Sequence, residues 1–243
     1  MLNNVKSLKI LKSIVGALKK RIELKLFKYN KIMLNKLNIK KENFEQFILL
    51  KEMNLKFNLD IKDIDIKELN LRQMKLENYI IEYLIKIKFN KLKVLNLEGN
   101  NISDIKGLEN VNFTTLEELD LGFNNISNID ILEKVNFKEL KKLYLHFNEI
   151  SDIKVFENVN FKELKKLNLR WNKISDIKVL ENVNFKELEK LDLSWNEISD
   201  IKVLEYVNFK ELKELDLSLN NIDNNSIIIK NLKSKKKNIL IEL

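Results

Sequence analysis

The sequence predicts an α/β solenoid, in which short parallel strands alternate with short helical or 3₁₀ return segments. Two observations lead to this prediction. Three leucines precede a recurring asparagine at constant spacing, and an isoleucine follows it two residues later. A single unit of this kind cannot bury its apolar side, so neighbouring units must stack on one another. The asparagine recurs at every twenty-fourth position without interruption, at Asn100, Asn124, Asn148, Asn172, Asn196 and Asn220.

The repeating unit reads L-x-x-L-x-L-x-x-N-x-I, as in Leu164, Leu167, Leu169 and Asn172. Leucine alternating with polar residues is typical of a strand with one buried face. Asparagine suits the following turn because its side chain bonds nearby backbone groups. Six tandem copies over residues 92–222 resemble the leucine-rich repeat family. The phrase I-S-D-I after the asparagine is similar to the short-repeat subfamily of bacterial internalins and eukaryotic phosphatase-regulatory proteins. The resemblance implies a solenoid with its strands on a concave face and a ladder of stacked asparagines.

Residues 1–65 precede the array and contain a basic segment with helical spacing of its apolar residues. Residues 1–41 hold twelve Lys or Arg and a single acid. Three interpretations are open. The segment is an α-helical cap over the open end of the solenoid core, or a basic amphipathic helix that lies on an anionic membrane. Residues 10–31 also resemble an F-box, which implies binding to the adaptor of a ubiquitin ligase.

A divergent unit is predicted at the N-terminal end of the array, over residues 66–91. Its apolar residues fall where the later leucines fall, and Met74 stands in place of the ladder asparagine. The six regular repeats then cover residues 92–222. We therefore expect strand pairing to begin before the first complete repeat.

The C-terminal end, residues 223–243, is predicted to be a cap with a closing strand. Ile239 and Ile241 lie one full period after the last two leucines of the sixth repeat. The basic run from Lys233 to Lys237 is interpreted as a solvated turn before that strand, with a nuclear-localisation signal as the alternative.

The strand residues between the leucines point outward on the concave face, and we expect a partner to bind there. The return segments that begin at residues 150, 174 and 198 are identical at all but two of fifteen positions, whereas outward strand positions differ in nearly every repeat. Basic and aromatic residues occupy the middle of the face, and acidic residues flank them. The predicted partner-binding residues are Lys142, Tyr144, His146, Lys166, Asn168, Arg170, Trp171, Lys190, Asp192, Trp195 and Asp216.

An aromatic residue precedes the asparagine in four repeats. We expect Phe123 and Phe147 to pack on the ladder, whereas packing and exposure to a partner are both open for Trp171 and Trp195. Tryptophan, tyrosine and arginine dominate binding hot spots. The expected partner therefore presents an acidic or apolar protrusion to the middle of the face, at Lys142, Lys166, Arg170 and Trp171.

Composition argues against several classes of function. The 243 residues include no Cys, no Pro and one His, which excludes disulfides, thiolate catalysis and multi-His metal sites. His146 lacks a plausible orienting triad, and Asp192 and Asp216 form only a two-carboxylate pair on an open face. The net charge of +8 comes from the two ends, because residues 92–229 carry 18 basic and 25 acidic residues. This acidic body lacks the continuous basic track that nucleic-acid binding needs.

The sequence thus predicts a non-catalytic scaffold that recognises a protein partner, with no catalytic residue, cofactor or metal. An F-box-like adaptor of a ubiquitin ligase is one alternative, and a phosphatase-type regulatory subunit is another. The most apolar stretches are too short for a transmembrane segment. We expect a cytoplasmic monomer, with the nucleus as the alternative location.

Overall fold

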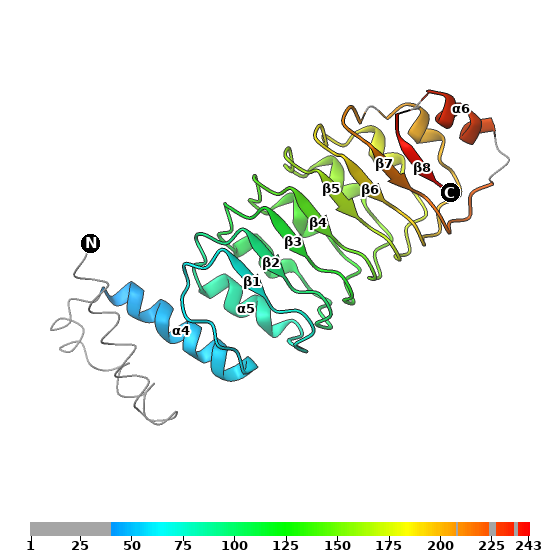
Figure 1. The fold of residues 1–243 in the computed structure, drawn as a ribbon. Coiled ribbons are helices and arrows are strands. Elements are labelled where there is room, and N and C mark those ends of the chain that lie inside the picture. Colours follow the sequence, from blue (N-terminus) through cyan, green and yellow to red (C-terminus); the bar gives the residue numbers. More distant parts are fainter. Residues whose placement is uncertain (1–39, 208, 224–226, 236–237) are drawn as a thin grey trace. The chain divides into compact units, whose positions relative to one another are not determined.

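The computed structural model describes residues 40–207, 209–223, 227–235 and 238–243. The chain divides into two compact units, residues 1–64 and residues 65–243 (Figure 1). The repeats lie in the second unit.

Helix α4 (Lys41–Phe57) belongs to the first unit. It ends where Asn58 adopts a left-handed conformation with φ of 53°, from which its N–H donates to the Asn54 carbonyl. The Asn54 side chain holds the following segment by donating to the Ile61 carbonyl and accepting from the Ile61 N–H. The F-box-like and membrane-helix interpretations concern residues 1–39, which lie outside the described residues. These interpretations, like the cap, stay predictions.

The second unit contains an open, parallel sheet whose eight strands are ordered as in the sequence. Its strands are β1 (Glu68–Asn70), β2 (Val94–Asn96), β3 (Glu118–Asp120), β4 (Lys142–Tyr144), β5 (Lys166–Asn168), β6 (Lys190–Asp192), β7 (Glu214–Asp216) and β8 (Leu240–Glu242). The first and last returns hold α5 (Tyr79–Lys86) and α6 (Ile227–Lys235). The others hold the 3₁₀ turns η1 (Lys106–Asn110), η2 (Asp130–Glu133), η3 (Lys154–Glu157), η4 (Lys178–Glu181) and η5 (Lys202–Glu205). The predicted solenoid of parallel strands and short returns is confirmed.

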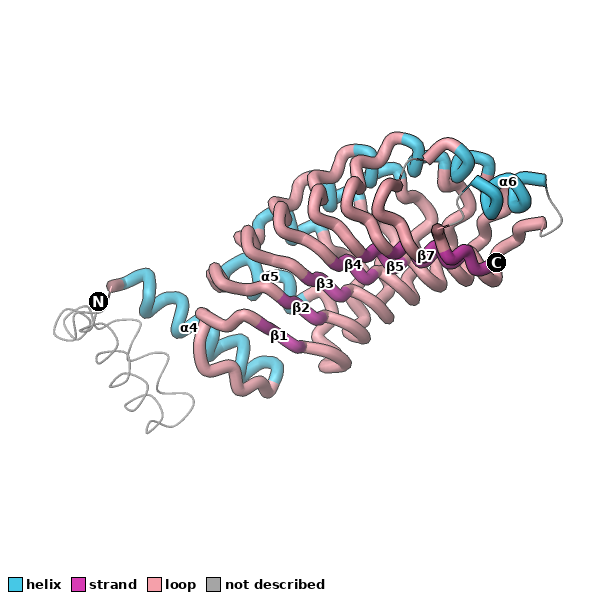
Figure 2. Tube along the Cα trace, turned by 45° about the horizontal axis from the view of Figure 1, so that its top comes forward, coloured by secondary structure: helices cyan, strands magenta, loops and turns pink. Residues whose placement is uncertain are grey.

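Strands lie side by side along one face of this unit, and the return segments lie along the opposite face (Figure 2). We call the outward side chains of β1 to β8, together with the residues that connect each strand to its ladder asparagine, the strand face. It is the face that the sequence predicts as concave.

The number of residues between paired positions of neighbouring strands changes at the C-terminal end of the sheet. Leu95 pairs with Leu119, exactly where the sequence period places it, and Leu191 pairs with Leu215 in the same way. Leu215, however, pairs with Ile241, which lies beyond the position that the period gives. The prediction that Ile239 and Ile241 correspond to the last two leucines of the sixth repeat is therefore wrong by two residues. The nine-residue helix α6 replaces a four-residue 3₁₀ turn and needs a longer return.

Because α6 extends to Lys235, the predicted turn at Lys233–Lys237 is also wrong for its first three residues.

Identical apolar residues from successive repeats fill the space between the sheet and the returns. The three leucines of each repeat are buried, and so are the phenylalanines Phe89, Phe113, Phe137, Phe161, Phe185 and Phe209. Burial of apolar surface contributes about 25 cal/mol per Å², so this repeated core is the main source of stability. Each strand is consequently held at a fixed depth, which brings its outward residues into columns along the strand face.

Candidate functional site

The asparagine ladder joins each repeat to the one before it at the edge of the strand face. Asn148 donates through Nδ2 to the carbonyls of Leu121 at 2.9 Å and Leu145 at 3.1 Å. Its Oδ1 accepts from the Ile126 N–H at 2.9 Å. The equivalent bonds recur at Asn220, whose side chain is less deeply buried. The ladder therefore closes the same turn after each strand.

The second outward column of the strand face is largely structural. In six strands an Asn or Asp accepts a hydrogen bond through Oδ1 from the N–H two residues later, which shapes the strand end. These residues are Asn70, Asn96, Asp120, Asn168, Asp192 and Asp216. Strand β4 carries Tyr144 instead, whose phenol cannot make this local bond. Three of the predicted partner-binding residues thus have a role in the fold itself, whereas Tyr144 has none in this turn.

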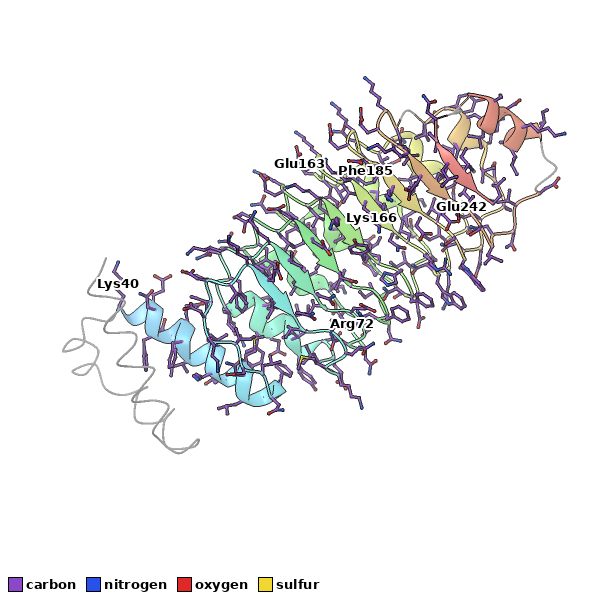
Figure 3. The ribbon with its side chains drawn as sticks, viewed as in Figure 1. Lys40, Arg72, Glu163, Lys166, Phe185 and Glu242 are labelled. Atoms are coloured by element: carbon purple, nitrogen blue, oxygen red, sulfur yellow. The ribbon has the colours of Figure 1, made fainter. Side chains whose placement is uncertain are left out.

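Two of the three central lysines on the strand face already have carboxylate partners. Lys142 binds Glu118 at 2.8 Å, and this bond raises the pKa of the Lys142 ammonium. Lys190 binds Glu214 at 2.7 Å. Lys166, labelled in Figure 3, instead lies with Nζ 5.1 Å from the centroid of the Tyr144 ring. Aligned repeats distinguish these lysines, because a glutamate lies one period from Lys142 and from Lys190, whereas lysines lie one period on either side of Lys166.

His146 lies against the backbone of Gly122 on the neighbouring strand. A Cβ added to Gly122 would overlap the imidazole, so the ring occupies space that only glycine leaves open. The ring packs edge-on against Phe123, with centroids 5.3 Å apart. His146 Nδ1 is buried and has no hydrogen-bond partner among the described residues. The pairing of His146 with a glycine one period earlier is a signal that sequence reasoning missed.

Four aromatic side chains form a continuous stack where the strands turn into the ladder. We call Phe123, Phe147, Trp171 and Trp195 the aromatic stack. Successive ring centroids are 4.1, 4.9 and 4.3 Å apart, with interplanar angles of 10°, 13° and 19°. Backbone hydrogen bonds between neighbouring repeats hold the rings in register. The Trp171 N–H donates to the Ser194 carbonyl of the next repeat, and the N–H of each other stack residue donates to the equivalent carbonyl in the repeat that follows it. The side chains remain 47% exposed at Phe123, 43% at Trp171 and 36% at Trp195.

The backbone of the stack is strained. Its four residues have φ between 52° and 55°, in the left-handed region that bulky side chains rarely adopt. The first repeat has Gly99 at the same place, with φ of 71°. A non-glycine residue in the left-handed conformation lowers the stability of the fold by about 1–3 kcal/mol. Each stacked pair of rings contributes about 0.5–1.5 kcal/mol, which offsets part of that cost. Leu219 has φ of 56° at the same position of the sixth repeat, so the left-handed backbone belongs to the repeat turn and the aromatic side chains add the stacking.

A second set of charges, which the sequence analysis missed, follows the first leucine of each repeat. Glu117 lies between Lys93 and Lys141, and Glu189 lies between Lys165 and Lys213. Hydrogen bonds from Lys141 and Lys93 lower the pKa of Glu117 from 4.5 to about 2. The order Lys, Glu, Lys, Lys, Glu, Lys at this position in successive repeats is the signal that could have revealed these links between strands.

The comparisons with known proteins agree with this geometry. A family model described as "Leucine Rich repeats (2 copies)" matches residues 90–134, 114–158 and 138–182. A second model, "Leucine Rich repeat", matches residues 187–201 and 211–228. Together they cover more than half of the chain. The chain belongs to the leucine-rich repeat family.

Solved structures of other proteins have the same fold as this leucine-rich repeat chain. Internalin C2 from Listeria monocytogenes has a TM-score of 0.50 and 24% sequence identity, covering 76% of this chain and 88% of that chain. A crystal structure of PEPR1–AtPEP1 has a TM-score of 0.50 and 24% identity, covering 66% of this chain and 22% of that chain. A comparison with curated proteins returned no match. Leucine-rich repeats are commonly protein–protein interaction domains and are generally non-catalytic.

The leucine-rich repeat unit also has a shallow hollow on its strand face, lined by residues of β5 to β8 that include Lys166, Asp192, Asp216 and Glu242. Asp192 and Asp216 each accept a further hydrogen bond from a serine hydroxyl at 2.6 Å. Across the part of the chain that the structure describes, no group of three or more His, Asp or Glu side chains is arranged to hold a metal ion. None of the described helices is long and apolar enough to cross a membrane.

Proposed function

We propose that this leucine-rich repeat chain is a non-catalytic scaffold that recognises a protein partner through its strand face. The observation that carries the proposal is the exposed aromatic stack, which lies beside Tyr144, His146 and Arg170. Trp, Tyr and Arg are the residue types that contribute most to binding hot spots. A contiguous exposed apolar surface with a polar rim is typical of an interaction site.

Two features of the strand face support recognition rather than a purely structural role. Tyr144 interrupts a column in which six other strands carry an Asn or Asp that stabilises the strand end. The three return segments that begin at residues 150, 174 and 198 are repeated almost without change, while the strand face differs from repeat to repeat. Divergence that is limited to one face is expected when that face binds a specific partner.

Acid–base catalysis is less well supported by the same surface. The carboxylates at Asp120, Asp192 and Asp216 accept backbone hydrogen bonds, and Glu118 and Glu214 pair with lysines. His146 is packed against Gly122 and aromatic rings, and it interacts electrostatically with Asp120 while its Nδ1 has no hydrogen-bond partner among the described residues. These groups are therefore positioned as parts of the fold and of a binding surface.

The two alternative functions rest on features outside the strand face. The F-box-like adaptor depends on residues 10–31, which lie outside the described residues. The phosphatase-type regulatory subunit depends on the sequence resemblance of its subfamily. Capture of ubiquitin-ligase subunits by the full-length chain, and not by a chain that lacks residues 5–40, would favour the adaptor. The cytoplasmic location and the monomeric state stay predictions, which imaging and analytical ultracentrifugation can measure.

Site-specific crosslinking tests the proposal directly. A photoreactive amino acid replaces Tyr144 in the full-length chain in its native cell, and crosslinked proteins are identified by mass spectrometry. Tyr206 is the matched control, because it is 63% exposed and lies just after η5 on the opposite side of the repeats. We expect a partner that crosslinks from position 144, not from position 206, and is lost in Trp171→Ala. Identical crosslinks from both positions, or none from position 144, would contradict the proposal.

A further inference from the structure

The aromatic stack exposes the edges of its rings and conceals their faces. Phe147 stacks on Phe123 at 4.1 Å and on Trp171 at 4.9 Å, so both of its faces are covered. Trp171 is likewise covered by Phe147 and Trp195. Ligands that bind aromatic faces, such as methylated ammonium groups or nucleic-acid bases, therefore have no free face on the two inner rings.

Ring edges favour electronegative groups. An aromatic ring carries partial negative charge on its faces and partial positive charge at its edge. A row of exposed edges consequently attracts carboxylate and carbonyl oxygens as well as apolar groups. The stack is thus an apolar surface with a preference for anionic neighbours.

Two cations of the strand face lack a carboxylate partner in the described part of the chain, and one of them, Arg170, lies beside this row. Arg170 lies 5.8 Å from the Trp195 ring and donates one of its N–H groups to Ser194 Oγ at 3.2 Å. Lys166 lies over Tyr144. A guanidinium has five N–H donors, so most of those on Arg170 are available to a ligand. By contrast, Lys142 and Lys190 are already neutralised by glutamates.

Nearby acids reduce this positive charge only in part. Glu149 pairs with Lys173 at 3.2 Å on the far side of the stack. Asp192 accepts from Ser194 Oγ, the same hydroxyl that accepts from Arg170. Glu197, which follows Trp195 by two residues, is exposed. An anionic ligand is therefore expected over the two inner rings, Phe147 and Trp171, away from Glu197.

We propose that the aromatic stack, with Arg170 and Lys166, is the docking site for a short acidic segment of the partner protein. This inference rests on the proposed function and adds the chemistry of the partner. The three ring steps of 4.1 to 4.9 Å correspond to about four residues of an extended chain, at about 3.3 Å per residue. The segment carries Asp or Glu side chains for Arg170 and Lys166, and apolar side chains for the ring edges.

Peptide selection tests this chemistry. The full-length chain is the bait for a phage-displayed library of random peptides, and fluorescence anisotropy then measures the binding of a synthetic peptide from the enriched set. We expect enrichment of Asp and Glu beside apolar residues. Arg170→Glu and Trp171→Ala should weaken binding by about tenfold or more, as hot-spot substitutions do. Arg170→Lys keeps the charge and should weaken it less.

Matched controls separate binding from folding. Lys178→Glu makes the same change of charge as Arg170→Glu, but in η4, on the opposite side of the same repeat. Tyr206→Ala removes an exposed aromatic side chain from that side. Both controls should bind within about twofold of the parent chain, far from a hot-spot effect. Every variant must keep the thermal melting curve of the parent.

The outcomes distinguish this inference from the proposed function. Peptides that depend on Trp171 but show no enrichment of acids, or that bind Arg170→Glu as tightly as the parent, overturn the acidic-segment inference and leave the scaffold proposal intact. Peptide binding that no strand-face variant weakens contradicts both. Binding to phosphatidylserine vesicles that Trp171→Ala abolishes, with no acidic peptide selected, would assign the stack to a membrane surface and overturn the inference.

Discussion

Replacing Asn148 with alanine should destabilise the repeat unit by about 3–5 kcal/mol. The side chain of Asn148 is buried, and its loss leaves the Leu121 and Leu145 carbonyls and the Ile126 N–H without this partner. The Ile126 N–H is left unsatisfied, which costs about 1–3 kcal/mol. The two carbonyls keep hydrogen bonds from Asn124 and Asn172, so each lost bond costs about 1 kcal/mol and the sum is about 3–5 kcal/mol. Asn220 makes the same set of bonds but is less deeply buried. Water can replace part of its bonding, so Asn220→Ala should cost about 1–2 kcal/mol.

Urea denaturation of the full-length variants measures both values. The two tryptophans of the chain lie in the aromatic stack and report on the middle of the array by fluorescence, while far-UV circular dichroism reports on the whole chain. Coincident transitions allow a two-state analysis, and unequal ones show that repeats unfold separately. The reasoning is refuted if both substitutions cost the same, or if Asn148→Ala costs less than about 1 kcal/mol, because burial would then not determine the strength of the ladder.

Three further substitutions test other parts of the structure. Gly122→Ala should cost about 1–3 kcal/mol by overpacking against His146, and His146→Ala in the same chain should restore most of it in a double-mutant cycle. Phe156→Ala should cost about 3–5 kcal/mol in urea denaturation, whereas Phe156→Leu, the residue of the next two repeats, should cost less than about 1.5 kcal/mol. The folded pKa of Glu117, about 2, lies below its ordinary value of 4.5, so this carboxylate stabilises the fold above pH 4.5 and loses the effect as pH falls toward 2. Glu117→Gln should therefore lower stability at pH 7 by a few tenths to about 1 kcal/mol, the usual worth of exposed pairs, and match the parent near pH 2 in urea midpoints. Equal midpoints at pH 7 would contradict the ion-pair interpretation.

Much of the strand face follows from the sequence because a constant period places equivalent residues in one column. The ion pair between Lys142 and Glu118 joins residues one period apart, so its partners could have been found by aligning the repeats. The hydrogen bond that the Asp192 carboxylate accepts from the Ser194 N–H is also local. Exposure alone therefore overstates how available Lys142 and Asp192 are to a partner, because an exposed side chain can already be bonded within the fold.

The closing strand shows why spacing fails at the ends of the array. An α-helix and a 3₁₀ turn need different numbers of residues to connect the same two strands, and α6 shifts the register of β8 by two residues. Within the array every return has a similar length, so the period is constant. The return after β7 departs from this length because its sequence departs from the repeat pattern, and Ile227–Lys235 form an α-helix in place of a 3₁₀ turn.

The sequence by itself determined the solenoid, the strand positions and the asparagine ladder, because each depends on which residues must be buried once per turn of the solenoid. Tertiary structure alone decided how the exposed side chains meet. The stacking of Phe123, Phe147, Trp171 and Trp195 requires a left-handed backbone at each residue and backbone bonds that hold neighbouring repeats in step. Whether a ring offers its face or its edge depends on these three-dimensional constraints, and that orientation determines which ligands the surface favours.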